Sequence, residues 1–397
     1  MNRMNKKLIA VAVAGTFLAP AAALAQSSVT ISGKLIATFG SYKVGSMAAG
    51  AGGATGNTTE TVIRDESSRV IFLVREDLGG GLAAIGKFDF RAALDSGAGP
   101  ANTGESYIGL TSPTLGTIGM GRYDLHYGQH ASYTGVHSGL LSNPTAIFDV
   151  AQAGAIAIAR QSRTDNVIRY GSPKFADMFE VVVAYSASGG NNAGAANQEA
   201  DFRSANRKGS AWNVAPKIYG KNWEAGYSYW TNKGDIASGA TNVTTATTKH
   251  GGNSLYGTYV WGGLRGGLAW NKSKVDTTAA AGGATTTTSN RNAWGIPIAY
   301  NWGSHTVYGD FYRARSDKAT AFAGLDTKAN LMGLTYAYDL SKRTSVGLSY
   351  ARIKNGANAA FNLFAAAAPG TASAIGTHAV ANGEDPRFIS ATMRHNF

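Results

Sequence analysis

The sequence contains no cysteine and few charged side chains. Without cysteine, the chain can form no disulfide and has no thiol chemistry. Asp, Glu, Lys and Arg together make up only 15% of its 397 residues. A water-soluble enzyme of this length normally carries more charge and has helical segments with a 3.6-residue period. We find neither, so the composition argues against a soluble enzyme.

The mature sequence also lacks a long apolar run. No segment approaches the 18 or so apolar residues that a membrane-spanning helix requires. At the N-terminus, a shorter apolar run covers residues 8–18. It follows Arg3, Lys6 and Lys7 and precedes a small-x-small site at residues 23–25. This order predicts a signal peptide over residues 1–25, cleaved before Gln26. Its removal takes three basic residues from a formal charge of +12 and leaves +9.

Strict alternation of apolar and polar residues is what the sequence has in abundance. In the segment 28–40, Val29, Ile31, Leu35 and Phe39 alternate with polar or small residues. Segments 82–91, 223–230, 344–351 and 387–397 follow the same pattern. A period of two predicts β-strands that have one apolar face and one polar face.

The connections between these strands distinguish a membrane barrel from a soluble sandwich. Tight turns such as "EDLGGGL", "SPTLGT" and "YDLSKRT" alternate with much longer segments. Tyrosine and tryptophan gather near strand ends, as in "YSYW" and "YGTYVW". Short turns at one end, long loops at the other and aromatic girdles are typical of outer-membrane β-barrels. We therefore predict an all-β, transmembrane antiparallel barrel.

Four connections need separate treatment. Residues 124–163 are too long for an ordinary loop and contain apolar patches, so we expect them to fold into the lumen and pack on the wall. The Ala-, Thr- and Gly-rich segments 237–252, 277–290 and 357–384 are expected to be external, mobile loops.

Pro297 interrupts a predicted strand and should cause a bulge or an irregular pairing.

Several motifs resemble one known family. They are, in chain order, "QSSVTISG", "SSR" followed by "REDLGGGL", "YIGLTSPTLGTIGMGRYD", "NVIRYGSPKF", "YDLSKRTSVGLSYA" and "MRHNF". The set resembles the trimeric general porins of Gram-negative outer membranes and is most similar to the beta-proteobacterial branch. The resemblance implies a barrel of about 16 strands over residues 26–397, short periplasmic turns, long external loops and an inward-folded third loop at 124–163.

The resemblance also implies a function and partners. We expect a water-filled, cofactor-free channel in the outer membrane for the passive diffusion of ions and small hydrophilic solutes. The partners implied are two further copies in a homotrimer, outer-membrane lipid and the barrel assembly machinery. In the family, a terminal aromatic residue, here Phe397, is the signal that this machinery reads. No nucleic acid is expected, because Lys and Arg are dispersed and form no basic stripe.

The resemblance also implies where the channel is narrowest. In the family, acidic residues on the third loop face a basic cluster on the barrel wall at that point. Matched residue by residue, Arg69 and Arg163 fall in the basic cluster, and Asp149 lies on the loop with Asp124 at its root. At Glu105 the family normally has a basic residue, which puts strong anion selectivity in doubt.

Strand alternation extends this set. It puts Lys87, Asp89 and Arg91 on one face, and Arg169 on the same face as Arg163. The predicted pore-lining residues are Arg69, Arg163, Arg169, Arg91, Lys87, Asp89, Glu105 and Asp149. Because cations outnumber carboxylates in this set, we expect a permissive pore that weakly favours anions.

Alternatives remain open from the sequence. A substrate-selective channel for a sugar or an organic anion would share the same architecture. A barrel enzyme is disfavoured, because there is no G-x-S-x-G or H-E-x-x-H motif. His126, His130 and His137 could share a metal, but no carboxylate or thiolate completes a known motif, so a neutral loop packed on the wall is favoured and no metal is expected.

Overall fold

The computed structural model describes residues 27–44, 58–66, 68–96, 104–126, 163–187, 209–237, 244–279, 282–363 and 380–397. The predicted signal peptide and most of the 124–163 loop lie outside the described residues. No helix in the described part of the chain is long and apolar enough to cross a membrane.

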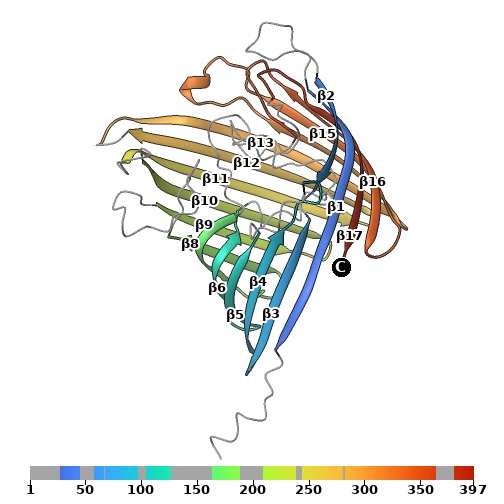
Figure 1. Cartoon of the computed structure of the whole chain (residues 1–397). Helices are drawn as coiled ribbons and strands as arrows, with labels where there is room; N and C mark the ends of the chain where they lie inside the picture. The colour runs from blue at the N-terminus through green and yellow to red at the C-terminus, as the bar shows by residue number, and fades with distance from the viewer. Residues whose placement is uncertain are drawn as a thin grey trace, which may run out of the picture.

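All strands belong to one antiparallel sheet that closes on itself (Figure 1). The first eight are β1 (Ser28–Val44), β2 (Thr58–Asp65), β3 (Arg69–Gly79), β4 (Leu82–Arg91), β5 (Ser106–Ser112), β6 (Gly116–Asp124), β7 (Arg163–Gly171) and β8 (Phe179–Ser186). The others are β9 (Gly209–Tyr219), β10 (Trp223–Ala237), β11 (Thr244–Trp261), β12 (Leu264–Ala279), β13 (Thr285–Trp302), β14 (His305–Ala314), β15 (Ala329–Asp339), β16 (Thr344–Asn355) and β17 (Arg387–Asn396), with the short 3-10 helix η4 (Thr320–Phe322) before β15.

β2 and β3 form a single barrel strand with a break. β1 pairs with β2 through its second half and with β3 through its first half. At the break, the Ser68 hydroxyl accepts a hydrogen bond from the backbone N–H of Ile36 at 2.9 Å, and the Asp65 carboxylate accepts one from the Ser68 N–H at 3.0 Å. Counting this pair once reduces the 17 strands of the sheet to a 16-stranded barrel, as predicted.

The barrel closes between β1 and β17, which lie side by side in Figure 1. Their ladder runs from Lys34 opposite Asn396 to Lys43 opposite Arg387. Beyond it, Gly33 and Phe397 exchange two backbone hydrogen bonds of 2.9 and 3.1 Å. A Cβ atom on Gly33 would lie 2.6 Å from Cζ of Phe397, so the glycine makes room for the ring. The seam is thus paired up to the last residue.

The two faces of the strands differ as the alternation predicted. On β17, Ile389 and Met393 are 62% and 55% exposed on the outer face, whereas Ser390 and Thr392 are buried on the inner face. Thr392 shares a hydroxyl hydrogen bond of 2.7 Å with Thr38 of β1. Exposed tryptophans and tyrosines, such as Trp261 and Tyr259, mark the outer surface near one end of the strands. The outer face therefore suits hydrocarbon and the inner face suits water.

Most connections alternate in length as predicted, although the connections 238–243 and 280–284 are shorter than the turn at 172–178. At one end of the barrel the strands are joined by tight turns at residues 80–81, 113–115, 172–178, 220–222, 262–263, 303–304 and 340–343. Gly80 and Gly81 occupy the first of these turns with positive φ angles of 60° and 80°, which only glycine adopts without strain. The "GGG" segment at residues 79–81 therefore forms a tight turn. All long connections lie at the opposite end.

Two segments that were expected to be external, mobile loops are mostly strand, so this prediction is wrong. The segments 237–252 and 277–290 contribute mostly to strands, because β11 begins at Thr244, β12 continues to Ala279 and β13 begins at Thr285. Their threonines are β-branched and pair across strands, as in the 2.8 Å hydrogen bond between the hydroxyls of Thr278 and Thr285. Low sequence complexity was therefore a poor guide to disorder here.

Pro297 does interrupt a ladder. The pairing of β12 with β13 stops after Gly266 opposite Ile298 and resumes at Ala269 opposite Gly295 in the same register. The irregularity is thus a gap in the pairing without an inserted residue. Pro297 is buried on the inner face and lies against Gly267.

The third expected external loop folds inward where it is described. Residues 356–363 and 380–386, together with 315–328, form a structure that we call the cap. Phe361 and Leu363 are 0% and 2% exposed and pack in one apolar cluster with Tyr42, Tyr312 and Phe388. These three side chains belong to the inner faces of β1, β14 and β17. The cap therefore fills part of the barrel interior at the end opposite the tight turns.

Arg291 of β13 holds two parts of the cap. Its Nη2 lies 3.7 Å from Oδ2 of Asp317, and its guanidinium carbon lies 4.7 Å from the ring centroid of Phe361. Its side chain is 3% exposed, and Nε and Nη1 have no hydrogen-bond partner in the described structure. Asp317 in turn accepts hydrogen bonds from the Ser289 hydroxyl and the Asn290 N–H. One incompletely satisfied cation thus joins residues 315–328 to residues 356–363.

Replacing Arg291 by alanine should loosen the cap, because removing one partner of a buried ion pair costs roughly 3–5 kcal/mol. Ala359 is 2% exposed and the chain has no cysteine, so Ala359→Cys introduces a single buried thiol. We expect a water-soluble thiol reagent to modify this cysteine about tenfold faster, or more, in the Arg291→Ala background.

Two controls accompany this measurement. Arg313→Ala removes the same charge from the outer face of β14 and should leave the rate unchanged. Thr320→Cys places a thiol at an exposed cap position and should react quickly in every background. Equal rates at residue 359 with and without Arg291 would show that Arg291 does not hold the cap.

Candidate functional site

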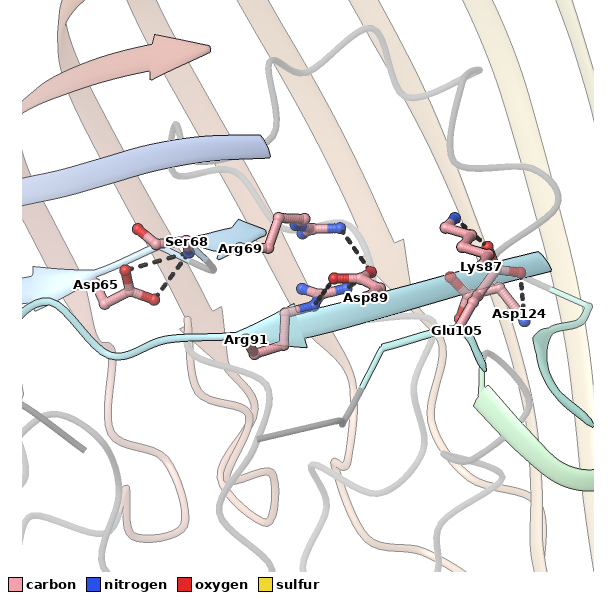
Figure 2. A network of polar contacts seen from close by, with 8 residues as sticks. All are labelled: Asp65, Ser68, Arg69, Lys87, Asp89, Arg91, Glu105 and Asp124. Carbon is pink, nitrogen blue, oxygen red and sulfur yellow. Dashed lines mark hydrogen bonds and ion pairs between the residues drawn. The ribbon is translucent and has the colours of Figure 1, made fainter. Parts of the chain in front are cut away.

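A row of cations crosses the inner face of β1, β3 and β4. Lys34 stands opposite Arg69, and Arg69 stands opposite Arg91, so the three residues are neighbours on one face. Directly opposite residues in an antiparallel pair have Cβ atoms roughly 5 Å apart. Figure 2 shows Arg69 and Arg91 converging on Asp89, which lies between them on β4.

Asp89 is the carboxylate that neutralises part of this row. Its Oδ2 accepts hydrogen bonds from Arg91 at 3.0 Å and from Arg69 at 3.5 Å, and Nε of Arg91 lies 3.0 Å from Oδ1. Asp89 is 2% exposed, and the backbone of Gly104 packs so closely that a Cβ there would lie 2.2 Å from Cγ of Asp89. One buried carboxylate is thus shared by two guanidinium groups, which leaves the row positive.

Lys34 and Arg394 extend the row to the seam. Lys34 interacts electrostatically with Arg69, Arg91 and Arg394. Arg394 stands on β17 opposite Ile36, on the inner face. Neither residue was in the predicted pore-lining set, although the alternation of the first and last strands had put both on the polar face. The alternation alone predicts both positions, whereas the family's basic-cluster motifs fall on other strands.

Glu105, a predicted pore-lining residue, lies beside Lys87 and is already paired. One oxygen accepts a hydrogen bond from Nζ of Lys87 at 2.6 Å (Figure 2). The other accepts the backbone N–H of Asp124 at 3.0 Å. This carboxylate thus neutralises one lysine and fixes the end of β6, where the 124–163 segment begins. Its effect on the charge of the lumen is therefore largely cancelled by Lys87.

An aromatic pair lies beside these ions. Tyr107 and Tyr123 stack with ring centroids 4.5 Å apart, and the guanidinium carbon of Arg169 lies 5.5 Å from the Tyr123 centroid. A Cβ on Gly119 would lie 2.0 Å from the Tyr123 hydroxyl, so the ring lies over this glycine. Arg169 stands opposite Gly119 on the inner face, and its role in lining the pore stays a prediction.

We call the inner-face cations of this arc the basic wall: Lys34, Arg69, Lys87, Arg91, Arg169 and Arg394. Four described carboxylates interact with these six cations: Asp89 and Glu105 in ion pairs, Asp339 with Arg394, and Glu66 with Lys34. Within the described residues the cations of the wall, which lie on β17, β1, β3, β4 and β7, therefore outnumber these carboxylates by two.

Two predicted residues cannot be placed by their side chains. Asp149 lies outside the described residues. For Arg163 only the backbone is described, opposite Asp124 at the start of β7. Between Arg163 and Arg169, Asn166 has a φ angle of 53° and the register of β6 with β7 shifts. A bulge interrupts the alternation on which the common face of the two arginines was argued, so the position of Arg163 stays a prediction.

His126 contacts the distant wall of the barrel. It is fully buried, and its Nδ1 lies 2.8 Å from the Ser228 hydroxyl of β10. Its backbone N–H donates to Oδ1 of Asn213 on β9 at 3.3 Å. His126 itself therefore packs on the wall, whereas His130 and His137 lie outside the described residues, so the packing of the rest of the loop stays a prediction. Within the described ranges, no group of three His, Asp or Glu side chains could hold a metal ion.

Comparisons with known proteins agree with this geometry. A family model described as "Gram-negative porin" matches residues 10–358. Among solved structures, an anion-selective porin from Comamonas acidovorans superposes with a TM-score of 0.70 at 22% identity, covering 94% of this chain and 100% of that one. The trimer form of OmpT from Vibrio cholerae superposes at 0.63, with 15% identity over 94% of this chain and 99% of that one.

A third structure, OmpF of Salmonella typhi in complex with daunomycin, gives a TM-score of 0.56 at 11% identity over 93% of this chain and 97% of that one. No curated protein sequence matches significantly. At these identities the solved structures establish the fold alone, whereas the family model covers most of the sequence. The chain belongs to the Gram-negative porin family.

Proposed function

We propose that this outer-membrane porin is a general diffusion channel with a weak preference for anions. The observation that carries the proposal is the basic wall, where six cations face the lumen and outnumber the four described carboxylates that interact with them. The Comamonas acidovorans protein of the same fold is described as anion-selective, which agrees in sign.

The physical argument concerns the potential inside a narrow aqueous lumen. A one-sided row of cations raises the local concentration of anions and orients polar solutes that carry a dipole. Salt screens exposed charges over about 10 Å at 0.1 M ionic strength, so the preference should be modest and should fall as salt rises. Asp89 and Glu105 reduce it further because each offsets a neighbouring cation.

Residues that complete the proposal lie at both ends of the chain. We propose that residues 1–25 direct export. Phe397, which is paired with Gly33 at the seam, is proposed to be the terminal residue read by the barrel assembly machinery. Catalysis forms no part of the proposal, since the family is one of channels.

The double variant Arg69→Gln/Arg91→Gln tests the sign of the selectivity. It removes two cations and also releases Asp89 from both partners, so it should lower the anion-to-cation permeability ratio severalfold. The reversal potential in a KCl gradient across a planar bilayer measures this ratio. Arg313→Gln removes one cation from the outer face and is the control. A wild-type channel with clear cation preference, or a double variant identical to it, would contradict the proposal.

A substrate-selective channel for a sugar or an organic anion is the alternative. The feature that favours it is the stacked Tyr107–Tyr123 pair beside Arg169, because aromatic faces and a guanidinium bind sugar rings and carboxylates. Liposome swelling in a series of neutral sugars separates the two functions. We expect rates that fall smoothly with solute size. A sugar that permeates faster or slower than its size predicts would favour the selective channel instead, provided that Tyr123→Ala restores the order by size.

We also propose a homotrimer that buries the outer face of β1, β3 and β4. In a single barrel this face exposes apolar side chains such as Val29, Ile31 and Phe88 beside small residues such as Ala37 and Gly86. Small residues allow close packing between subunits in a membrane. One of the structures of the same fold, OmpT, is described in a trimer form.

Two matched glycines test this assembly. Gly86→Trp would add a large side chain to the proposed interface, whereas Gly309→Trp would add one to the outer face of β14, where a Cβ meets nothing within 4 Å. On a mildly denaturing gel we expect a heat-sensitive band of about three times the monomer mass that Gly86→Trp weakens and Gly309→Trp leaves unchanged. A monomer band alone in the wild type would rule out a stable trimer.

A further inference from the structure

Two carboxylates lie beside Tyr42, where the cap meets the barrel wall. Glu60 of β2 stands directly opposite Tyr42 of β1 on the inner face. Glu384 belongs to the cap segment that leads into β17, and it is 1% exposed. Both carboxylates interact electrostatically with the Tyr42 hydroxyl. The junction thus brings negative charge from the cap and from the wall to one phenol.

The carboxylate of Glu384 is only partly satisfied. Its Oε2 accepts a hydrogen bond from the backbone N–H of Ala381 at 2.7 Å. Its Oε1 is buried and has no hydrogen-bond partner among the described residues. A buried carboxylate is stable when a cation or several donors lie against it, because an unpaired buried charge costs several kcal/mol. This oxygen is therefore placed to bind a positively charged ligand.

The described cations do not neutralise this pair of carboxylates. Neither Glu60 nor Glu384 forms an ion pair within the part of the chain that the structure describes. Arg64 also interacts electrostatically with Tyr42, but its Nε lies 3.4 Å from Oε1 of Glu66 in an ion pair. The nearest guanidinium on β2 is thus already balanced.

Cations at neighbouring strand positions are engaged or face away. Arg352 of β16 pairs with Asp385, the residue after Glu384, at 2.8 Å. Lys43 and Arg387 stand opposite each other on the outer face, whereas Tyr42 is on the inner face. Two carboxylates of the inner face therefore remain without a counter-ion among the described side chains.

The ligand atoms at this junction are all oxygens. The Tyr42 hydroxyl donates a hydrogen bond of 2.9 Å to Oδ1 of Asn362, so a phenol and an amide oxygen lie together beside the carboxylates. Calcium and magnesium take carboxylate, amide and water oxygens, whereas zinc sites use His or Cys. The described residues hold no group of three His, Asp or Glu side chains for a metal. Two carboxylates with neutral oxygens therefore suit a hard divalent cation bound with modest affinity.

We propose that Glu384 and Glu60 bind a divalent cation, calcium or magnesium, that fastens the cap to the barrel wall. One ligand belongs to the cap and the other to β2, so an ion bound by both opposes movement of the cap away from the wall. Asn355 transmits this hold, because its Nδ2 donates hydrogen bonds to the carbonyl oxygens of Phe361 and Glu384 at 2.9 and 2.6 Å. The site lies near the external end of β1, beyond the basic wall, so it is independent of the proposed anion preference.

The test measures whether calcium slows the opening of the cap in the full folded porin. Ala359→Cys supplies the buried thiol of the cap. We expect calcium chloride, half-effective at about 0.1–1 mM, to slow its reaction with a water-soluble thiol reagent about fivefold or more, because the ion binds the closed cap. Glu384→Gln and Glu60→Gln should each raise the half-effective concentration about tenfold or more. The matched control Glu76→Gln changes an exposed carboxylate near the periplasmic turns and should respond like the wild type.

Terbium(III) gives a direct measurement of binding. It takes oxygen ligands as calcium does, and it luminesces when a neighbouring tyrosine, here Tyr42, is excited. We expect a saturable signal that calcium displaces and that Glu384→Gln removes. A heat-modifiable band on a mildly denaturing gel shows that each variant is folded, and Glu60→Gln decides the test where Glu384→Gln does not fold.

Three outcomes overturn the proposal. A labelling rate that calcium and magnesium both leave unchanged would mean that no divalent cation fastens the cap. An equal slowing by sodium chloride at the same ionic strength would identify screening of charge in place of binding. A full calcium response in folded Glu384→Gln and Glu60→Gln would place the ion elsewhere on the protein.

Discussion

The structure depends on the need to pair every backbone polar group where no water is present. In hydrocarbon an unpaired N–H or C=O costs several kcal/mol, so a sheet edge cannot stay open. The exchange of hydrogen bonds between Gly33 and Phe397 and the Ser68 hydroxyl at the break between β2 and β3 both meet this need. Pro297, which cannot donate, stands where its ladder has a gap beside Gly267, and its side chain lies inside the barrel.

A second constraint concerns charge inside the barrel. The carboxylates there link neighbouring strands, and this reduces their effect on ion selectivity. Asp89 joins two arginines of adjacent strands, and Glu105 joins Lys87 to the end of β6. A carboxylate in a place where the family has a cation therefore changes the lumen less than its formal charge suggests. At the external end, Arg291 joins two segments of the cap and is covered by them. The lumen is thus polar along one wall and packed with apolar side chains along another.

The sequence was sufficient wherever a property is local. Alternation correctly placed the faces of β1, β4 and β17, because side-chain direction in a strand depends only on its neighbours. The same rule put Lys34 and Arg394 on the polar face, although neither was in the predicted pore-lining set. It could not reach across Asn166, whose positive φ angle changes the register, and composition could not reveal the threonine pairing of β12 with β13. The cap was missed because Phe361 is buried by Tyr42 and Tyr312, and no local pattern reports such distant contacts.

The seam also has a kinetic meaning. The hydroxyls of Thr38 and Thr392 meet across 354 residues of chain, whereas most other strand pairs join neighbours in sequence. Contacts of such high order form late and slowly. Until they form, β1 and β17 are two free edges that can pair with other chains. The time between synthesis and closure is therefore the most aggregation-prone period in the life of this protein.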